Sequence, residues 1–325
     1  MNDNMKVLVV GGAGYVGGAA TDILLKEDHQ IRVYDALFYE ESYRKPIEFI
    51  YGDVRDTAKL KPQLEWADSV ILLAALVGDP ACALNPSVSI LINQESVKWL
   101  ADHFDGRIIF LSTCSVYGAQ DTILDELSPT MPLSVYATTK LEAEKYLQEK
   151  NAIIFRLGTL FGIGDLYSRI RLDLVVNSLT VKAFQFGKIS VFGGNQYRPL
   201  LHVRDAAQAI IDNINTKSTG IFNLHKENIR IIDLAKKVHE YFPKLIIDRT
   251  ERKFEDTRNY RISSNKAEKI LGFKPKISID QGITELKSLL ESGRLKDFDN
   301  PRYTNQKYLS LYSSHIRGEF ADGRN

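Results

Sequence analysis

Short apolar runs recur along the first half of the chain, separated by longer segments in which apolar residues return at helical spacing. Continuous apolar runs of this length are typical of strands buried on both faces, as in a parallel sheet covered by helices. The pattern therefore predicts an α/β fold with a Rossmann-like, doubly wound parallel sheet. The predicted strands are 7–10, 31–34, 48–50, 70–73, 108–111 and 152–155.

The regular alternation loosens after about residue 161, where glycine-containing turns separate longer mixed segments. A helix at 203–214 and a strand around 221–223 nevertheless fit the sheet domain. We therefore expect a discontinuous boundary and a polar C-terminal tail with little helical or strand periodicity. The predicted parts are a sheet domain of 1–165 plus about 203–225, a smaller C-terminal domain of about 166–202 and 226–292, and a tail of 293–325.

Composition and charge narrow the possible partners. A chain of 325 residues, 44% of them hydrophobic, can bury a sizeable core. Its 42 basic and 41 acidic residues leave a formal charge of +1 without a long block of one sign, so no nucleic-acid partner is expected. No apolar stretch approaches the ~20 residues of a membrane-spanning helix, which predicts a cytoplasmic protein without a membrane partner. Cys82 and Cys114 are too few for a disulfide framework or a thiolate metal site, so no metal is expected.

A glycine-rich segment follows the first predicted strand and opens a helix. Gly11 permits a tight turn, Gly14 lets the backbone approach a pyrophosphate, and Gly17 allows the helix to pack closely on the sheet. The helix N-terminus, with Tyr15 and Val16 in its first turn, would face the phosphates. This arrangement predicts a dinucleotide site.

An acidic residue selects between the two nicotinamide dinucleotides. Asp35 ends the second predicted strand, where a carboxylate reaches the adenosine ribose and would repel a 2′-phosphate, so NAD is favoured over NADP. Other strands end at the same edge of the sheet, where ligands of such folds bind. The residues expected there are Asp53, Val54, Leu73, Ala74 and Ala75.

Tyr136 and Lys140 lie one helical turn apart, so they share a face of a predicted helix. An ammonium near a phenol favours the phenolate and lowers its pKa, which would make Tyr136 an acid or base for a hydroxyl. Thr113, which follows the fifth predicted strand, offers a hydroxyl at the same edge of the sheet.

From these motifs the chain resembles the extended short-chain dehydrogenases, in the group of NAD-dependent nucleotide-sugar epimerases and dehydratases, over essentially residues 5–290. The resemblance implies that Tyr136 is the acid/base, that Lys140 holds the nicotinamide ribose, that Thr113 binds the reacting hydroxyl, and that Asn93 lines the cofactor site. It assigns the sheet domain to NAD and the smaller domain to the nucleotide sugar. It also implies a homodimer formed by a four-helix bundle of 87–104 and 133–148.

The same resemblance suggests substrate contacts in the second half. Arg198 is the candidate for the substrate's diphosphate, because a planar guanidinium binds phosphate in a bidentate manner. Arg252 or Arg258 would supply a second phosphate contact. Asn177 matches a position that touches the nucleotide in relatives, and Arg171 is a further candidate for that pocket.

The residues after Thr113 bear on the reaction. Sugar 4,6-dehydratases carry an Asp–Glu pair where this chain has Cys114 and Ser115, which disfavours dehydration. Cys114 sits where a soft acid could protonate a carbanion, although a buried structural cysteine is favoured. The leading hypothesis is a 4-epimerase, which oxidises the sugar transiently at C4. The alternative is a 4-dehydrogenase or 4-ketoreductase, for example on a GDP-linked heptose or hexose in bacterial surface polysaccharide synthesis. A non-catalytic NAD-binding regulator is disfavoured because Thr113, Tyr136 and Lys140 are all present.

Overall fold

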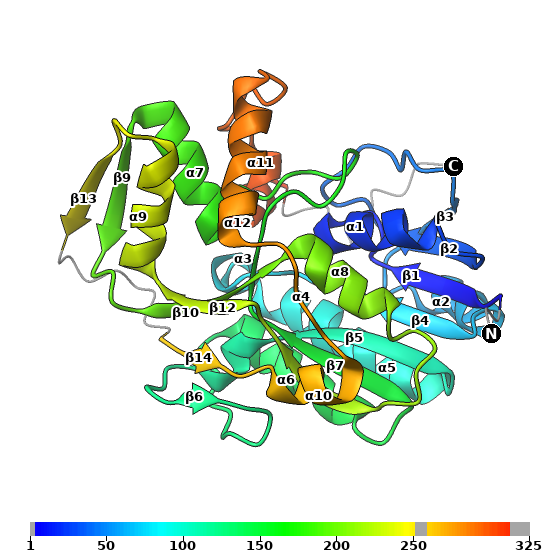
Figure 1. Cartoon of the computed structure of the whole chain (residues 1–325). Helices are drawn as coiled ribbons and strands as arrows, with labels where there is room; N and C mark the ends of the chain where they lie inside the picture. The colour runs from blue at the N-terminus through cyan, green and yellow to red at the C-terminus, as the bar shows by residue number, and fades with distance from the viewer. Residues whose placement is uncertain (1–3, 251–258, 313–325) are drawn as a thin grey trace.

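The computed structural model describes residues 4–250 and 259–312. Seven parallel strands form its central sheet, in the order β3-β2-β1-β4-β5-β7-β11 (Figure 1). The strands are β1 (Lys6–Val10), β2 (Gln30–Asp35), β3 (Glu48–Tyr51), β4 (Ser69–Leu72), β5 (Arg107–Thr113), β7 (Ala152–Leu157) and β11 (Gly220–Leu224). All six strands expected in the first half are therefore present, and the predicted doubly wound parallel sheet is confirmed.

Helices cover both faces of this sheet because alternate residues of each strand point to opposite sides. Val7 and Val9 of β1 pack in one core with α1 and α8, whereas Leu8 and Val10 pack in a second core with α2, α5 and α6. The helices are α1 (Tyr15–Leu24), α2 (Thr57–Trp66), α5 (Ser96–His103), α6 (Val135–Leu147) and α8 (Val203–Ile211). Both faces of the sheet are thus covered by helices, as expected from its continuous apolar runs.

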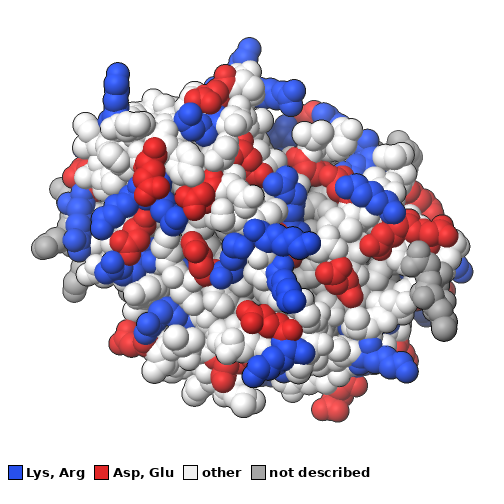
Figure 2. All heavy atoms as spheres, in the orientation of Figure 1, with Lys and Arg blue, Asp and Glu red and all other residues white. Residues whose placement is uncertain are grey.

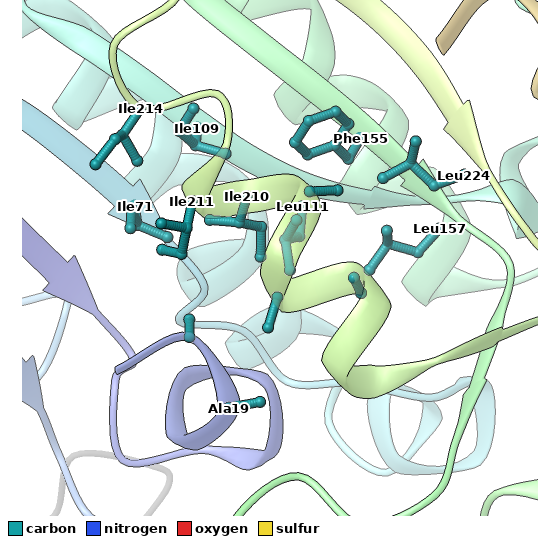
Figure 3. Packing of buried hydrophobic residues seen from close by; sticks show 14 of the residues in the cluster. Ala19, Ile71, Ile109, Leu111, Phe155, Leu157, Ile210, Ile211, Ile214 and Leu224 are labelled. Carbon is teal, nitrogen blue, oxygen red and sulfur yellow. The ribbon is translucent and has the colours of Figure 1, made fainter. Parts of the chain in front are cut away.

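The segments expected to return to the sheet do so. β11 pairs with β7 at the edge of the sheet, and α8 lies on the face that α1 also covers (Figure 3). Ile210 and Ile211 of α8 pack over Ile71 and Ile109 of the sheet, as Figure 3 shows. The edge strand and its helix therefore belong structurally to the first half of the chain.

A smaller core lies beside the sheet, around Phe161, Val176, Leu200 and Leu234 (Figure 1). Its elements come from both sides of α8 and β11 in the sequence. They are β8 (Thr159–Phe161), α7 (Val175–Phe186), β9 (Lys188–Phe192), β10 (Tyr197–His202), β12 (Glu227–Arg230), α9 (Ile231–Tyr241), β13 (Ile246–Thr250) and α11 (Ile279–Glu291). The remaining short elements are β6 (Ile123–Leu124), β14 (Arg261–Ile262) and α10 (Asn265–Leu271); β14 pairs with β6, and α10 contacts β11.

The predicted helix over 87–104 is interrupted. The chain forms α3 (Asp79–Ala83), α4 (Pro86–Ile90), one π-helical turn (Leu91–Glu95) and then α5. Turns of this kind are frequent at functional sites, because the extra residue redirects a side chain. Here it carries Asn93.

The C-terminal tail contains secondary structure that its sequence did not predict. A 3-10 turn (Pro301–Tyr303) leads into α12 (Asn305–Leu311), whose Leu309 is buried among residues of the sheet core. The helix is short and packs mainly through Leu309, Asn305 and Tyr308, so it shows no clear periodicity.

Basic and acidic side chains are interspersed over the face of the molecule seen in Figure 2. Among the helices of the described residues, none is both long and apolar enough to cross a bilayer.

Candidate active site

A cavity of about 620 Å³ lies at the carboxyl ends of the sheet strands and continues into the smaller core. Parallel strands in this fold bind ligands at this edge. The cavity brings together most residues that the sequence singled out. They are Gly11, Gly14, Tyr15, Val16, Gly17, Asp35, Asp53, Val54, Leu73, Ala74, Ala75, Thr113, Tyr136, Lys140 and Arg198.

The glycine-rich turn fits a dinucleotide. Gly11 has φ +88°, and a Cβ there would lie 2.4 Å from the Ala74 amide nitrogen, while a Cβ on Gly17 would lie 2.6 Å from the Gly12 Cα, so packing requires both glycines. A Cβ on Gly14 would meet only the Gly11 carbonyl oxygen, at 3.4 Å. Gly14 therefore leaves room in the cavity, whereas Gly11 and Gly17 are required by the packing of the fold. No side chain caps α1, which leaves its N-terminus available to a phosphate.

Asp35 is held rigidly at the cavity wall. Its carboxylate accepts hydrogen bonds from the backbone of Ala13 (3.0 Å) and Leu37 (2.7 Å). Burial raises the pKa of Asp35, and these two bonds act in the opposite direction. The carboxylate is thus oriented before any ligand arrives, as a ribose contact requires.

Replacing Asp35 by alanine should relax the preference for NAD over NADP about tenfold or more, because the repulsion of a 2′-phosphate by the carboxylate is lost. Titration of the protein with each dinucleotide gives the ratio of the two dissociation constants. Asp35→Asn keeps the shape and removes the charge, so it should shift the ratio in the same direction. A ratio unchanged in both variants would remove Asp35 as the discriminator.

Thr113, Tyr136 and Lys140 converge on the cavity from β5 and α6. Thr113 is the last residue of β5, and its hydroxyl accepts a hydrogen bond from the Ser115 amide at 3.1 Å. Ser134 caps α6 through the Ala137 amide and also binds Asp79, which fixes the start of the helix that carries Tyr136. The hydroxyl, phenol and ammonium therefore share one wall.

Burial changes the pKa values expected for Tyr136 and Lys140. The sequence predicts a lowered pKa for Tyr136, but burial, and to a lesser extent the neighbouring Cys82 and Asp79, raises that pKa well above its ordinary value, and a hydrogen bond with Thr113 opposes the rise. Burial also lowers the pKa of Lys140 to about 7, and its ammonium lies 4.1 Å from the centre of the Phe110 ring. Desolvation is the largest cause of both pKa shifts.

Two predicted contacts do not line the cavity. Asn93 is fully buried, and its side-chain amide binds the backbone N–H (2.8 Å) and carbonyl (2.9 Å) of Leu76, so it supports the loop after β4 from behind. Asn177 is also fully buried, and its amide binds the backbone of Gly162 and the Arg171 carbonyl. Both amides are occupied by backbone groups, so we correct their roles from ligand contact to positioning.

Cys114 also points away from the cavity. Its side chain is completely buried, its thiol donates to the Arg156 carbonyl at 3.2 Å, and burial raises its pKa well above the ordinary value. It is the structural cysteine that the sequence favoured, and the soft-acid hypothesis is wrong. Ser115 does line the cavity, 3.4 Å from the Tyr260 hydroxyl.

Several cationic side chains line the cavity. Arg198 is buried there and donates to the Tyr197 carbonyl at 2.8 Å. Arg171 also lines the cavity; burial opposes its charge, but a bidentate pair with Asp173 at 2.9 and 3.0 Å holds its pKa above the ordinary value. Arg252 and Arg258 lie outside the described residues.

Further polar residues line the cavity that no sequence motif predicted. They come from loops, helix faces and strand β9, without a motif, and only the fold brings them to the cavity. They are Asp79, Arg169, Lys182, Ser190, Gln196 and the C-terminal residues Thr304, Asn305 and Gln306.

Known proteins are similar to this chain in sequence and in fold. The chain is 28% identical over 317 residues to a UDP-glucose 4-epimerase of Lactobacillus helveticus (84% of this chain, 92% of that protein). It is 23% identical to UDP-glucuronic acid decarboxylase 1 of Danio rerio (87% and 72%). The structure of a UDP-glucuronic acid 4-epimerase from Bacillus cereus, in complex with UDP-glucuronic acid and NAD, has the same fold (TM-score 0.74, 23% identity, 89% and 99% of the two chains).

The profile of the NAD dependent epimerase/dehydratase family matches residues 7–224, which include the glycine-rich turn and the Tyr136–Lys140 pair. This match confirms the predictions of an enzyme and of NAD as its cofactor. The chain belongs to the NAD dependent epimerase/dehydratase family.

Proposed function

We propose that the protein is a nucleotide-sugar 4-epimerase. The observation that carries the proposal is one continuous cavity whose wall holds Thr113, Tyr136 and Lys140 between the glycine-rich turn and Arg198. In this proposal a dinucleotide occupies the part of the cavity at the glycine-rich turn, and a diphosphate-linked sugar occupies the part at Arg198. Similarity to UDP-glucose 4-epimerases supports the same activity.

Each residue of the triad has a distinct task in this proposal. Tyr136 removes the proton from the sugar C4 hydroxyl and later returns it. Thr113 binds that hydroxyl and orients it, and the Lys140 ammonium stabilises the phenolate form of Tyr136 that accepts the proton. When bound, NAD supplies an acceptor for the C4 hydride that also returns it to the other face of the ketosugar.

The cavity offers no second acid–base pair directly after Thr113, since Cys114 is withdrawn and Ser115 is a hydroxyl. Elimination of water needs such a pair. This supports chemistry limited to hydride and proton transfer at one carbon. Arg198 is proposed to hold the diphosphate, and Lys182 is a further cation that lines the cavity.

The proposed domain roles follow from the cavity. The sheet domain, 1–165 and about 203–225, would bind NAD, and 166–202 with 226–292 would bind the nucleotide sugar. The cytoplasmic location also stays a proposal.

We further propose a homodimer formed through 87–104 and 133–148. Exposed apolar side chains on these segments support the homodimer: Ile90, Leu91 and Leu133 are 41%, 48% and 56% exposed.

The test is incubation of the NAD-loaded protein with UDP-, GDP-, CDP- and dTDP-hexoses, UDP-glucuronic acid and GDP-heptose. Products are identified by NMR and NADH is followed by absorbance. Inversion at C4 without net NADH is the expected result. Accumulation of NADH with a 4-ketosugar would instead establish the 4-dehydrogenase, and loss of carbon dioxide would establish a decarboxylase.

A further inference from the structure

The C-terminal arm, residues 293–312, crosses the cofactor end of the cavity. It leaves α11 at Gly293, whose φ of +68° turns the chain, and ends in α12. Three consecutive residues of the arm, Thr304, Asn305 and Gln306, line the same cavity as Gly11 and Gly14.

The topology of the sheet shows what the arm covers. β1 lies between β2 and β4. Tyr308 of the arm packs on Tyr39, in the loop after β2, with ring centres 5.0 Å apart, while Asn305 donates to the carbonyl of Val77, in the loop after β4, at 2.7 Å. A segment attached to both loops passes over the carboxyl end of β1, where the glycine-rich turn begins.

Asn305 is the central attachment of the arm. Its side chain is 3% exposed, and its backbone N–H donates to the Asp173 carboxylate at 3.0 Å. Its side-chain oxygen accepts a hydrogen bond from Arg169, which also donates to the Arg302 carbonyl at 2.5 Å. One side chain thus joins the loop after β4, the loop after β8 and the arm.

Further contacts tie the arm to the loop after β2. Arg302 pairs with Glu40 at 2.7 Å, and the Arg169 guanidinium lies 3.7 Å from the centre of the Tyr39 ring. Leu309 is buried in the sheet core. The arm is therefore anchored along its length by polar, aromatic and apolar contacts.

We propose that the C-terminal arm forms part of the NAD site, with residues 304–306 as one wall, and that it slows release of the dinucleotide. In this proposal a dinucleotide bound at the glycine-rich turn leaves the cavity past the arm, so its departure requires breaking the Asn305 and Tyr308 contacts. Retention suits an enzyme that regenerates its cofactor in every turnover. The inference rests on the proposed use of the cavity for NAD and not on which sugar reaction follows.

The test measures release directly. The full-length protein is loaded with NADH, mixed with excess NAD in a stopped-flow instrument, and the loss of NADH fluorescence is followed. Tyr308→Ala and Asn305→Ala should release NADH about tenfold faster or more, since changes in affinity appear mainly in dissociation rates. Tyr308→Phe keeps the ring, and Ser310→Ala alters an exposed residue of α12, so both should release it at the wild-type rate.

Thermal unfolding shows whether each variant is folded. Because Asn305 is buried and its loss could unfold the arm, the half-buried Tyr308 is the primary position. A folded Tyr308→Ala protein that releases NADH as slowly as wild type would overturn the role of the arm and leave the 4-epimerase proposal standing. Failure of the wild-type protein to bind NADH would overturn both.

Discussion

Tyr136→Phe should lower kcat by about 10²- to 10⁴-fold, the contribution typical of a positioned acid or base. In the proposed mechanism the Tyr136 phenol, which lines the cavity together with Thr113, exchanges a proton with the sugar hydroxyl. Burial and the Phe110 ring hold Lys140 in place without the phenolic oxygen, so NAD affinity should change little. Steady-state kinetics and a dinucleotide titration measure the two effects separately.

The matched control is Tyr146→Phe, the same substitution on the same helix. The Tyr146 hydroxyl meets the Gln94 amide at 3.4 Å, and the residue does not line the cavity. Its kcat should stay near that of wild type. Undiminished turnover of Tyr136→Phe would remove Tyr136 from its catalytic role and with it the proposed mechanism.

Glu144→Ala should lower the free energy of unfolding by about 3–5 kcal/mol, because it leaves a buried charge without its partner. Glu144 is 1% exposed and binds the Arg156 guanidinium at 2.6 Å, and it accepts a further hydrogen bond from Ser112. Arg156 would keep only the Tyr117 hydroxyl, at 3.0 Å, among these partners. Urea unfolding of the two proteins gives the difference.

The same helix provides the comparison. Glu142 pairs with Lys145 at 2.6 Å on the surface, so Glu142→Ala should cost about 1 kcal/mol or less. Replacing both Glu144 and Arg156 by methionine removes the whole pair and should recover part of the loss. A cost below about 1 kcal/mol for Glu144→Ala would show that Arg156 finds another partner or water.

This ion pair also bears on the active site. Glu144 follows Lys140 by one turn of α6, and its charge raises the pKa of Lys140 against the larger effect of burial. Ser112, which binds Glu144, precedes Thr113. The pair therefore holds both elements that carry the triad, β5 and α6.

Hydrophobic periodicity and short motifs were sufficient to predict the parallel sheet and the glycine-rich turn. The buried strands read as unbroken apolar runs because both faces are covered, and that signal is local to each strand. Gly11, Gly14 and Gly17 act within a single turn, and Tyr136 with Lys140 within a single helical turn, so spacing alone predicts their proximity. Resemblance to a known family extended these motifs to NAD and to Arg198.

Tertiary structure alone decided how individual side chains are used. Asn93 and Asn177 stand where a ligand contact was expected, yet the fold satisfies their amides with backbone groups of Leu76 and Gly162. Cys114 turns inward because a 3-10 turn follows β5 (Arg107–Thr113). The direction of a side chain depends on packing between segments that are distant in the sequence, and hydrophobic periodicity carries no information about such packing.

The C-terminal arm shows the same limit most clearly. Its sequence has no apolar periodicity, since α12 is seven residues long and is held mainly by Asn305, Tyr308 and Leu309. Tyr39, Val77 and Asp173, which contact Tyr308 and Asn305, lie in loops more than 130 positions earlier in the chain. Local sequence determined the strands and the glycine cradle, whereas only the long-range contacts of the folded chain brought the arm across the cavity.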